Sequence, residues 1–480
     1  MRKTPYIALL FVLLIQGCTS YTTKLTTPVD RDPIKHERIS IYDKGVACYD
    51  KKDFKCALSN FLKSAEKGDA NAQYNIGLFY NNGKGVKQDY FKAFEWYMKA
   101  AKQGSPMAQC NIGFLYNNGK GVKQDYFKAF EWFMKAAEQG HLDAQYGIGH
   151  LYYEGLGVKQ DYFKAFEWFM KAAEQGHLDA QFGIGLLYYE GKGVNQDYSK
   201  AFEWYMKAGE QGSPIAQLNI GASYVKGEGV KQDYFKAFEW YMKAAEQGHL
   251  DAQYGIGHLY YEGKGVNQDY FKAFEWYMKA AKQGYVKAQN NIGFAYNNGE
   301  GVKQDYFKAF EWYMKAAKQG HPDAQYNIGV LYRNGEGVKQ DYFKAFEWYM
   351  KAAEQGSPIA QLNIGVYYNN GKGVKQDYFK AFEWFMKAAE QGSPIAQLNI
   401  GVYYNNGKGV KQDYFKAFEW FMKAAKQGYF KAQYYVGVYY NNGKGVRQDK
   451  SMAKKWFGKA CDNRSQMGCD NLKTLNEQGY

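Results

Sequence analysis

The sequence predicts an all-α solenoid built from tandem helix–turn–helix units of 36 residues. The stretch DYFKAFEWYMKAA first occurs whole at residues 89–101 and returns in near-identical copies. A period of 20–50 residues indicates an array of supersecondary units, each burying its apolar face against its neighbours. The spacing of tryptophan fixes the period, because all eleven Trp residues lie on one ladder with steps of 36 residues: Trp96, Trp132, Trp168, Trp204, Trp240, Trp276, Trp312, Trp348, Trp384, Trp420 and Trp456.

Each unit reads as a first helix, a glycine-rich turn, a second helix and a short turn; we call the two helices A and B. In the first full unit we expect helix A over residues 72–82, with the small Gly77 permitting close helix contact. Gly83 and Gly85 follow in the turn, where they allow positive φ. Asp89 then stands at the position of an N-cap for helix B, and Gly104 ends that helix.

Helix B is apolar almost all round. Its polar residues Lys92, Glu95, Lys99 and Lys102 are spaced to form a single narrow solvent stripe. Aromatic residues interleaved with lysine can stack on nucleic acid. At helical spacing and among Ala and Met, however, they indicate core, so residues such as Phe91 are predicted to pack on helix A of the same unit and the next. We therefore expect no nucleic-acid partner.

The N-terminal residues predict export. Arg2 and Lys3 precede an apolar run at residues 7–15 that is too short to span a bilayer, so residues 1–17 are predicted to be a signal peptide. The stretch ending in Cys18 resembles a bacterial lipobox, which implies lipid attachment at Cys18. Thr19 follows in place of the Asp that marks inner-membrane retention, which implies the outer membrane, on its periplasmic or surface face. The alternative is an ordinary signal peptide with an incidental cysteine.

Four further segments follow the signal peptide. Residues 18–37 are polar and predicted to be a flexible tether, and residues 38–68 an atypical helical hairpin. Residues 72–467 are predicted to form eleven uninterrupted units, and residues 468–480 a capping helix. Terminal units of solenoids are usually atypical in this way.

The repeated motif A-Q-x-N-I-G-x-x-Y-x-N-G-x-G-V-x-Q-D-x-x-K-A-x-x-W-x-x-K-A-A-x-Q-G resembles the Sel-1-like repeat. The resemblance implies a right-handed α/α superhelix related to tetratricopeptide repeats. It also implies an adaptor that binds other proteins or cell-surface components, without a cofactor.

The stretch KACDNRSQMGC at the C-terminal end resembles the cysteine-rich, Hcp-type branch of exported Sel-1-like proteins. The resemblance implies a disulfide between Cys461 and Cys469, and the same separation gives Cys48–Cys56. Cys110 has no partner at this spacing. That branch carries a β-lactamase label, so a β-lactam-binding or β-lactam-hydrolysing enzyme is the alternative function.

Neither catalysis nor metal binding follows from the residues themselves. Ser-x-x-Lys occurs three times, beginning at Ser64, Ser223 and Ser451, but the Ser-Asp-Asn and Lys-Thr-Gly elements of a serine β-lactamase do not occur. The pairs His150/Glu154 and His258/Glu262 each offer two ligands on one helix, which does not make a zinc site. We therefore expect no catalytic residues and no metal.

Differences between near-identical units carry more information than their sameness. Substitutions concentrate on helix A, where positions equivalent to residues 74, 78 and 81/82 share one face. The resemblance places this face on the concave side, where it would bind a protein or peptide, or an anionic envelope polymer attracted by the formal charge of +14. One alternative is that the substitutions are neutral drift on a face exposed to solvent. Another is that the positive charge is only solvated and attracts no polymer. The candidate binding residues are Tyr146, His150, Tyr153, Glu154, Phe182, Tyr189, Glu190, Tyr254, His258, Tyr261 and Glu262.

The lipid anchor is testable. Cys18→Ser removes the thiol that would carry the lipid, so we expect the protein to move from the membrane fraction to the soluble fraction. Fractionation is to be done in high salt, because the positive charge of the chain attracts anionic membranes and salt screens that attraction. A serine variant that stays with the membranes in high salt would show that lipid is not the anchor.

Overall fold

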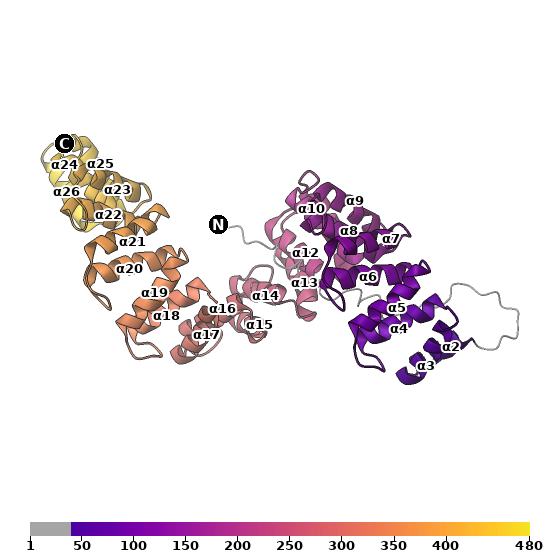
Figure 1. Cartoon of the computed structure of the whole chain (residues 1–480). Coiled ribbons are helices and arrows are strands. Elements are labelled where there is room, and N and C mark those ends of the chain that lie inside the picture. The colour runs from indigo at the N-terminus through magenta and orange to yellow at the C-terminus, as the bar shows by residue number, and fades with distance from the viewer. Residues whose placement is uncertain (1–39) are drawn as a thin grey trace. The chain divides into compact units, whose positions relative to one another are not determined.

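The computed structural model describes residues 40–480, and within this range the chain is helical with no strand (Figure 1). It divides after Gln247 into two compact units. Consecutive helices pack as antiparallel hairpins in each unit, which confirms the predicted all-α solenoid. The predicted signal peptide (1–17), Cys18 and the tether (18–37) lie outside the described residues.

The atypical hairpin and the first five repeats make up the helices of the first compact unit. They are α2 (Ile41–Asp50), α3 (Phe54–Ala65), α4 (Ala70–Asn82), α5 (Tyr90–Lys102), α6 (Pro106–Asn118), α7 (Tyr126–Ala137), α8 (Leu142–Glu154), α9 (Tyr162–Ala173), α10 (Leu178–Glu190), α11 (Tyr198–Glu210), α12 (Pro214–Lys226) and α13 (Tyr234–Glu246).

The second compact unit holds the remaining repeats and the terminal helix. Its helices are α14 (Leu250–Glu262), α15 (Tyr270–Lys282), α16 (Val286–Asn298), α17 (Tyr306–Lys318), α18 (Pro322–Asn334), α19 (Tyr342–Glu354), α20 (Pro358–Asn370), α21 (Tyr378–Glu390), α22 (Pro394–Asn406), α23 (Tyr414–Lys426), α24 (Phe430–Asn442), α25 (Lys450–Asp462) and α26 (Gln466–Glu477).

Capping residues set the helix ends. Helix A of the first repeat begins at Ala70, two residues before the expected start, because the Asp69 side chain accepts hydrogen bonds from the backbone N–H groups of residues 71 and 72. It ends at Gly83, whose φ of 67° lies in the left-handed region. Asp89 caps helix B as predicted by accepting from the backbone N–H of Lys92.

Two glycine positions of the repeat allow close packing. A Cβ on Gly77 would lie 2.4 Å from the ring of Tyr97, so this glycine lets helix A sit directly on the largest core ring of helix B. A Cβ on Gly121 would lie 2.4 Å from the carbonyl oxygen of Tyr90, at the start of the preceding helix B. The turn glycine therefore serves the contact between repeats as well as its own positive φ of 70°.

Within each compact unit, a buried glutamine on helix A links successive repeats. Gln361 on α20 is 5% exposed; its amide donates to the carbonyl of Ala353 on α19 at 3.1 Å. Its oxygen accepts from Gln391, just after α21, at 2.7 Å. The acceptor side of this contact recurs at Gln73, Gln109, Gln145, Gln181, Gln217, Gln253, Gln289, Gln325, Gln397 and Gln433. We call this contact the glutamine bridge.

Helix B departs from the prediction at one position. Phe91 was expected in the core but is 57% exposed, because it lies one helical turn before Glu95 on the solvent stripe. The core of helix B comes instead from Ala93, Tyr97 and Ala100. The equivalent phenylalanines are exposed by 57–61% in nine repeats: Phe91, Phe127, Phe163, Phe235, Phe271, Phe307, Phe343, Phe379 and Phe415.

Disulfides close both ends of the described array. Cys48–Cys56 joins α2 to α3 and Cys461–Cys469 joins α25 to α26, which confirms both predicted pairs. Cys110 is buried and takes part in neither disulfide. Terminal repeats have a neighbour on one side only, and a covalent link between the paired helices restricts the unfolded chain there.

The glutamine bridge predicts a local loss of stability on substitution. Gln361→Met keeps the length of the side chain but leaves the Ala353 carbonyl and the Gln391 amide without their partner, which costs about 1–3 kcal/mol. Since neighbouring repeats carry most of the coupling, hydrogen exchange should accelerate in α19–α22 and not elsewhere. Glu383→Met, on the exposed stripe of α21, is the control. Equal acceleration throughout residues 248–480 would contradict this assignment.

Candidate partner-binding site on the A helices

The predicted helix A residues differ in exposure between the two compact units. In the first unit Tyr146, His150, Tyr153 and Phe182 are buried, with 5–6% of each exposed, instead of lining an open surface. Tyr146 stacks between the rings of Phe169 at 5.4 Å and His177 at 5.0 Å. Little of these four side chains is therefore open to a partner, and their contact with one stays a prediction.

The second unit leaves the same positions open. Helix α14 has the same thirteen-residue sequence as α8, LDAQYGIGHLYYE, yet the side chain of His258 is 50% exposed whereas His150 is 6% exposed. Tyr254 and Tyr261 are half-buried. Because the two sequences are identical, the difference comes from their surroundings and not from local propensity.

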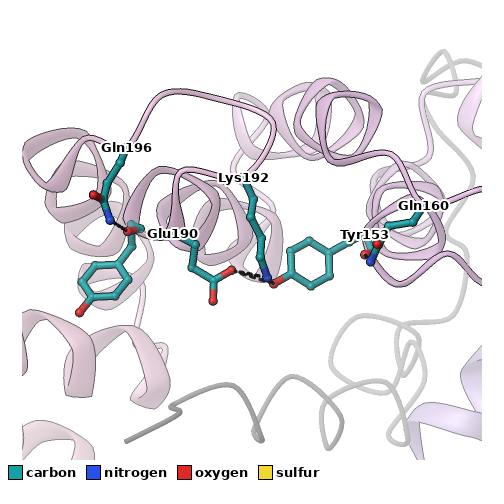
Figure 2. Close-up of polar contacts among 6 residues, drawn as sticks. Tyr153, Gln160, Glu190, Lys192 and Gln196 are labelled. Atoms are coloured by element: carbon teal, nitrogen blue, oxygen red, sulfur yellow. Dashed lines mark hydrogen bonds and ion pairs between the residues drawn. The ribbon is translucent and has the colours of Figure 1, made fainter. Parts of the chain in front are cut away.

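A tyrosine–glutamate–lysine cluster joins α8 to α10 in the first unit. Tyr153 donates its hydroxyl proton to Glu190 at 3.0 Å, and the Lys192 ammonium lies 2.9 Å from Glu190 and 3.3 Å from the Tyr153 oxygen (Figure 2). The same ammonium lies 5.2 Å from the Tyr153 ring and 5.1 Å from the Tyr162 ring. Burial and the charge of Glu190 raise the pKa of Tyr153 to about 12, so the hydroxyl stays a donor.

The next repeat builds the same cluster with the two charges exchanged along the chain. Tyr189 donates to Glu228 at 3.0 Å, and Lys226 lies 3.0 Å from the Tyr189 oxygen and 3.3 Å from Glu228. Each tyrosine also packs edge-on against the first tyrosine of its own helix B, Tyr153 on Tyr162 and Tyr189 on Tyr198. Both clusters thus contain their own cation.

A pocket of about 290 Å³ opens between α14, α15 and α16 in the second unit. Tyr261 again packs edge-on against the first tyrosine of helix B, Tyr270, at 5.2 Å. Burial and a hydrogen bond to Glu300 raise the pKa of Tyr261 to about 12. Rings of Tyr254 and Tyr277, 5.4 Å apart, and Phe294 complete an aromatic wall.

Two acceptor atoms in the residues that line this pocket have no hydrogen-bond partner among the described residues. They are Glu300 Oε2 and Asn290 Oδ1, and both are shielded from bulk water. Buried polar atoms are paired in the great majority of cases, so two unpaired acceptors in one pocket point to a missing donor. The nearby Glu262 is already paired, with Lys264 at 2.7 Å and His258 at 3.3 Å.

The other sequence candidates do not assemble into a chemical site. Ser64 donates to Asp69 at the N-terminus of α4, and Lys226 belongs to the tyrosine cluster. Over residues 40–480 no three His, Cys, Asp or Glu side chains gather as metal ligands. Glu154 is half-buried on α8, and no ion pair joins it to His150 in this range. Nothing in the described chain supports the β-lactamase alternative.

Sequence reasoning missed Asn290, Phe294 and Glu300. The first two lie on the variable face of α16, at the positions of Tyr254 and His258 one repeat later. Glu300 lies in the turn that carries Lys in seven of the eleven repeats. This reversal of charge at a fixed position was the available signal, but a turn residue is normally taken as solvated, and only the structure places it against Tyr261.

The repeated hairpins, their buried bridges and the side chains gathered between neighbouring A helices define an α-helical repeat scaffold suited to protein interaction. The chain belongs to the Sel1 repeat family. The family's sequence profile matches eleven consecutive repeats over residues 70–105, 106–141, 142–177, 178–213, 214–249, 250–285, 286–321, 322–357, 358–393, 394–429 and 430–465.

Two solved structures of the same fold agree with this assignment. A protective antigen present in uropathogenic Escherichia coli strains, with an SLR fold, is 39% identical, covers 88% of this chain and 90% of its own, and has a TM-score of 0.72. A Sel1 repeat protein from Oxalobacter formigenes is 36% identical, with coverages of 64% and 90% and a TM-score of 0.55. Cysteine rich protein B of Helicobacter pylori is 32% identical over 28% of this chain and 97% of its own, with a TM-score of 0.24. No curated protein sequence matches the chain.

The buried His150 predicts a pH-dependent stability. Burial lowers its pKa from 6.5 to about 4, so unfolding gains a proton in the range between these values. Stability should therefore fall as the pH drops below 6.5, by about 2 kcal/mol at pH 5. His150→Gln should remove this part of the loss in urea unfolding at pH 7 and pH 5. His258→Gln, on the identical helix but half-exposed, is the control. A pH dependence unchanged in His150→Gln would contradict the burial.

Proposed function

We propose that the chain is an exported, lipid-anchored adaptor that binds a protein or peptide along the concave face lined by its A helices. The observation that carries this proposal is the pocket between α14, α15 and α16, where variable helix A residues of two adjacent repeats form an accessible aromatic wall. A few large aromatic side chains usually dominate the energy of an interface. Helix B, by contrast, repeats almost unchanged and mainly supplies core.

The envelope part of the proposal has three supports. The N-terminal residues have the pattern of a lipoprotein signal ending at Cys18. Two disulfides are stable in an exported protein and rare in the cytosol. A similar structure belongs to a protective antigen of uropathogenic Escherichia coli, and a protective antigen is reached by the immune system. Within residues 40–480 no helix has the length and apolar character needed to cross a membrane.

A matched pair of substitutions tests the binding face. Phe294→Ala removes a 39% exposed ring from helix A, and Phe307→Ala removes a 60% exposed ring from helix B of the same repeat. The full chain, immobilised, is used to capture partners from an envelope extract, and the affinity of each captured protein is then measured. We expect Phe294→Ala to weaken binding at least tenfold, about 1.4 kcal/mol or more. If only Phe307→Ala weakens it, helix B is the working surface.

A further inference from the structure

We infer that the pocket between α14, α15 and α16 takes a lysine side chain of the bound peptide, with its ammonium against Glu300. The inference rests on the proposed function and names the chemistry of one contact. It comes from comparing three equivalent clusters of this chain, of which two contain a lysine of their own and the third does not.

The three clusters share a tyrosine and a carboxylate. Tyr153 pairs with Glu190, and Tyr189 with Glu228, each at 3.0 Å. Glu300 stands at the same sequence separation from Tyr261 as Glu228 does from Tyr189, and burial together with Glu300 raises the pKa of Tyr261 to about 12. In each case the tyrosine packs edge-on against the first tyrosine of its helix B, with ring centroids 5.2–5.3 Å apart.

The cation differs. Lys192 lies 2.9 Å from Glu190 in the first cluster, and Lys226 lies 3.3 Å from Glu228 in the second. The residue of the third cluster that corresponds to Lys226 is Asn298, which accepts a hydrogen bond from Asn297. Over residues 40–480 no lysine or arginine forms an ion pair with Glu300, and its Oε2 atom has no hydrogen-bond partner.

The chemistry of the pocket selects a cation. The Oε2 atom of Glu300 is shielded from water and has no hydrogen-bond partner, so a positive partner is favoured there and an anion is disfavoured. Asn290 Oδ1 supplies a second acceptor without a donor. The rings of Tyr254, Tyr261, Tyr270 and Phe294 offer the π faces that attract an ammonium and pack on its aliphatic stem. Lys192 makes contacts of this kind inside the chain, since its ammonium lies about 5 Å from the rings of Tyr153 and Tyr162.

The charges around the pocket leave room for that cation. Glu262 is occupied by Lys264 and His258 on α14 and the turn after it. The side chains of His258 and Phe294 reach solvent, so a ligand has access. A pocket of about 290 Å³ holds a lysine side chain.

The experiment compares two short peptides on the purified full chain by ligand-observed NMR. They are acetyl-Gly-Lys-Gly-amide and the same peptide with Nε-acetyl-lysine, which keeps the stem and lacks the charge. We expect only the first to bind. Glu300→Gln should weaken it at least tenfold. Glu336→Gln, at the same turn position one repeat later and outside the pocket, should not change it.

A second variant fills the site from within. Asn298→Lys places a lysine where Lys226 stands in the second cluster, so it should raise the thermal midpoint and weaken the lysine peptide at least tenfold. Equal binding of the two peptides, or equal effects of Glu300→Gln and Glu336→Gln, would overturn the inference. Binding of N-acetylglucosamine without the lysine peptide would identify a sugar site instead.

The outcomes separate the two proposals. In one outcome, the lysine peptide binds selectively and through Glu300, but Phe294→Ala does not affect partner capture. This outcome would contradict the proposed binding face and support the lysine pocket. In the other outcome, partner capture depends on Phe294 but not on Glu300, and the two peptides bind equally. This outcome would support the proposed binding face and contradict the lysine pocket.

Discussion

The glutamine bridge is the contact on which the rest of the structure depends. Each buried glutamine receives a hydrogen bond from the end of helix B of its own repeat, and in most repeats it also donates to the end of the preceding helix B. A buried amide left without partners is costly, so three successive helices are held in one relative arrangement. The Gly77-type contact then brings helix A onto the helix B ring. Variable side chains project from this fixed frame, so their differences alone distinguish one repeat from another.

Most of the fold followed from the sequence because a period of 36 residues leaves few arrangements open. The helix pairs, the Asp caps, the left-handed glycines and both disulfides were predictable from position and residue type. The exposure of Phe91 and its equivalents was not predictable in this way. The hydrophobicity of phenylalanine favours burial, and its exposure follows only from the direction in which the second residue of helix B points. The two-residue shift of the helix A start came from Asp69, whose cap depends on backbone geometry.

The candidate site was less predictable. Identical sequences in α8 and α14 differ in exposure, so no rule applied to either segment alone could separate His150 from His258. The role of Glu300 depends on Tyr261, which lies 39 residues earlier in the chain. It also depends on Asn298, two residues before Glu300, where the second cluster has a lysine. Such a relation spans adjacent repeats, and it becomes visible only when equivalent clusters are compared in space.

The repeated bridge also has a mechanical consequence. Within each compact unit, adjacent repeats meet through nearly the same contacts, so a force that pulls on the ends of that unit meets a series of similar resistances. Each repeat that unravels releases 36 residues, or about 120 Å of extended chain. The two disulfides enclose only short loops near residues 48 and 461. They therefore reduce the length of chain that the terminal helices release on unfolding, but they do not resist the separation of one repeat from the next. A chain of this kind lengthens in steps and absorbs tension.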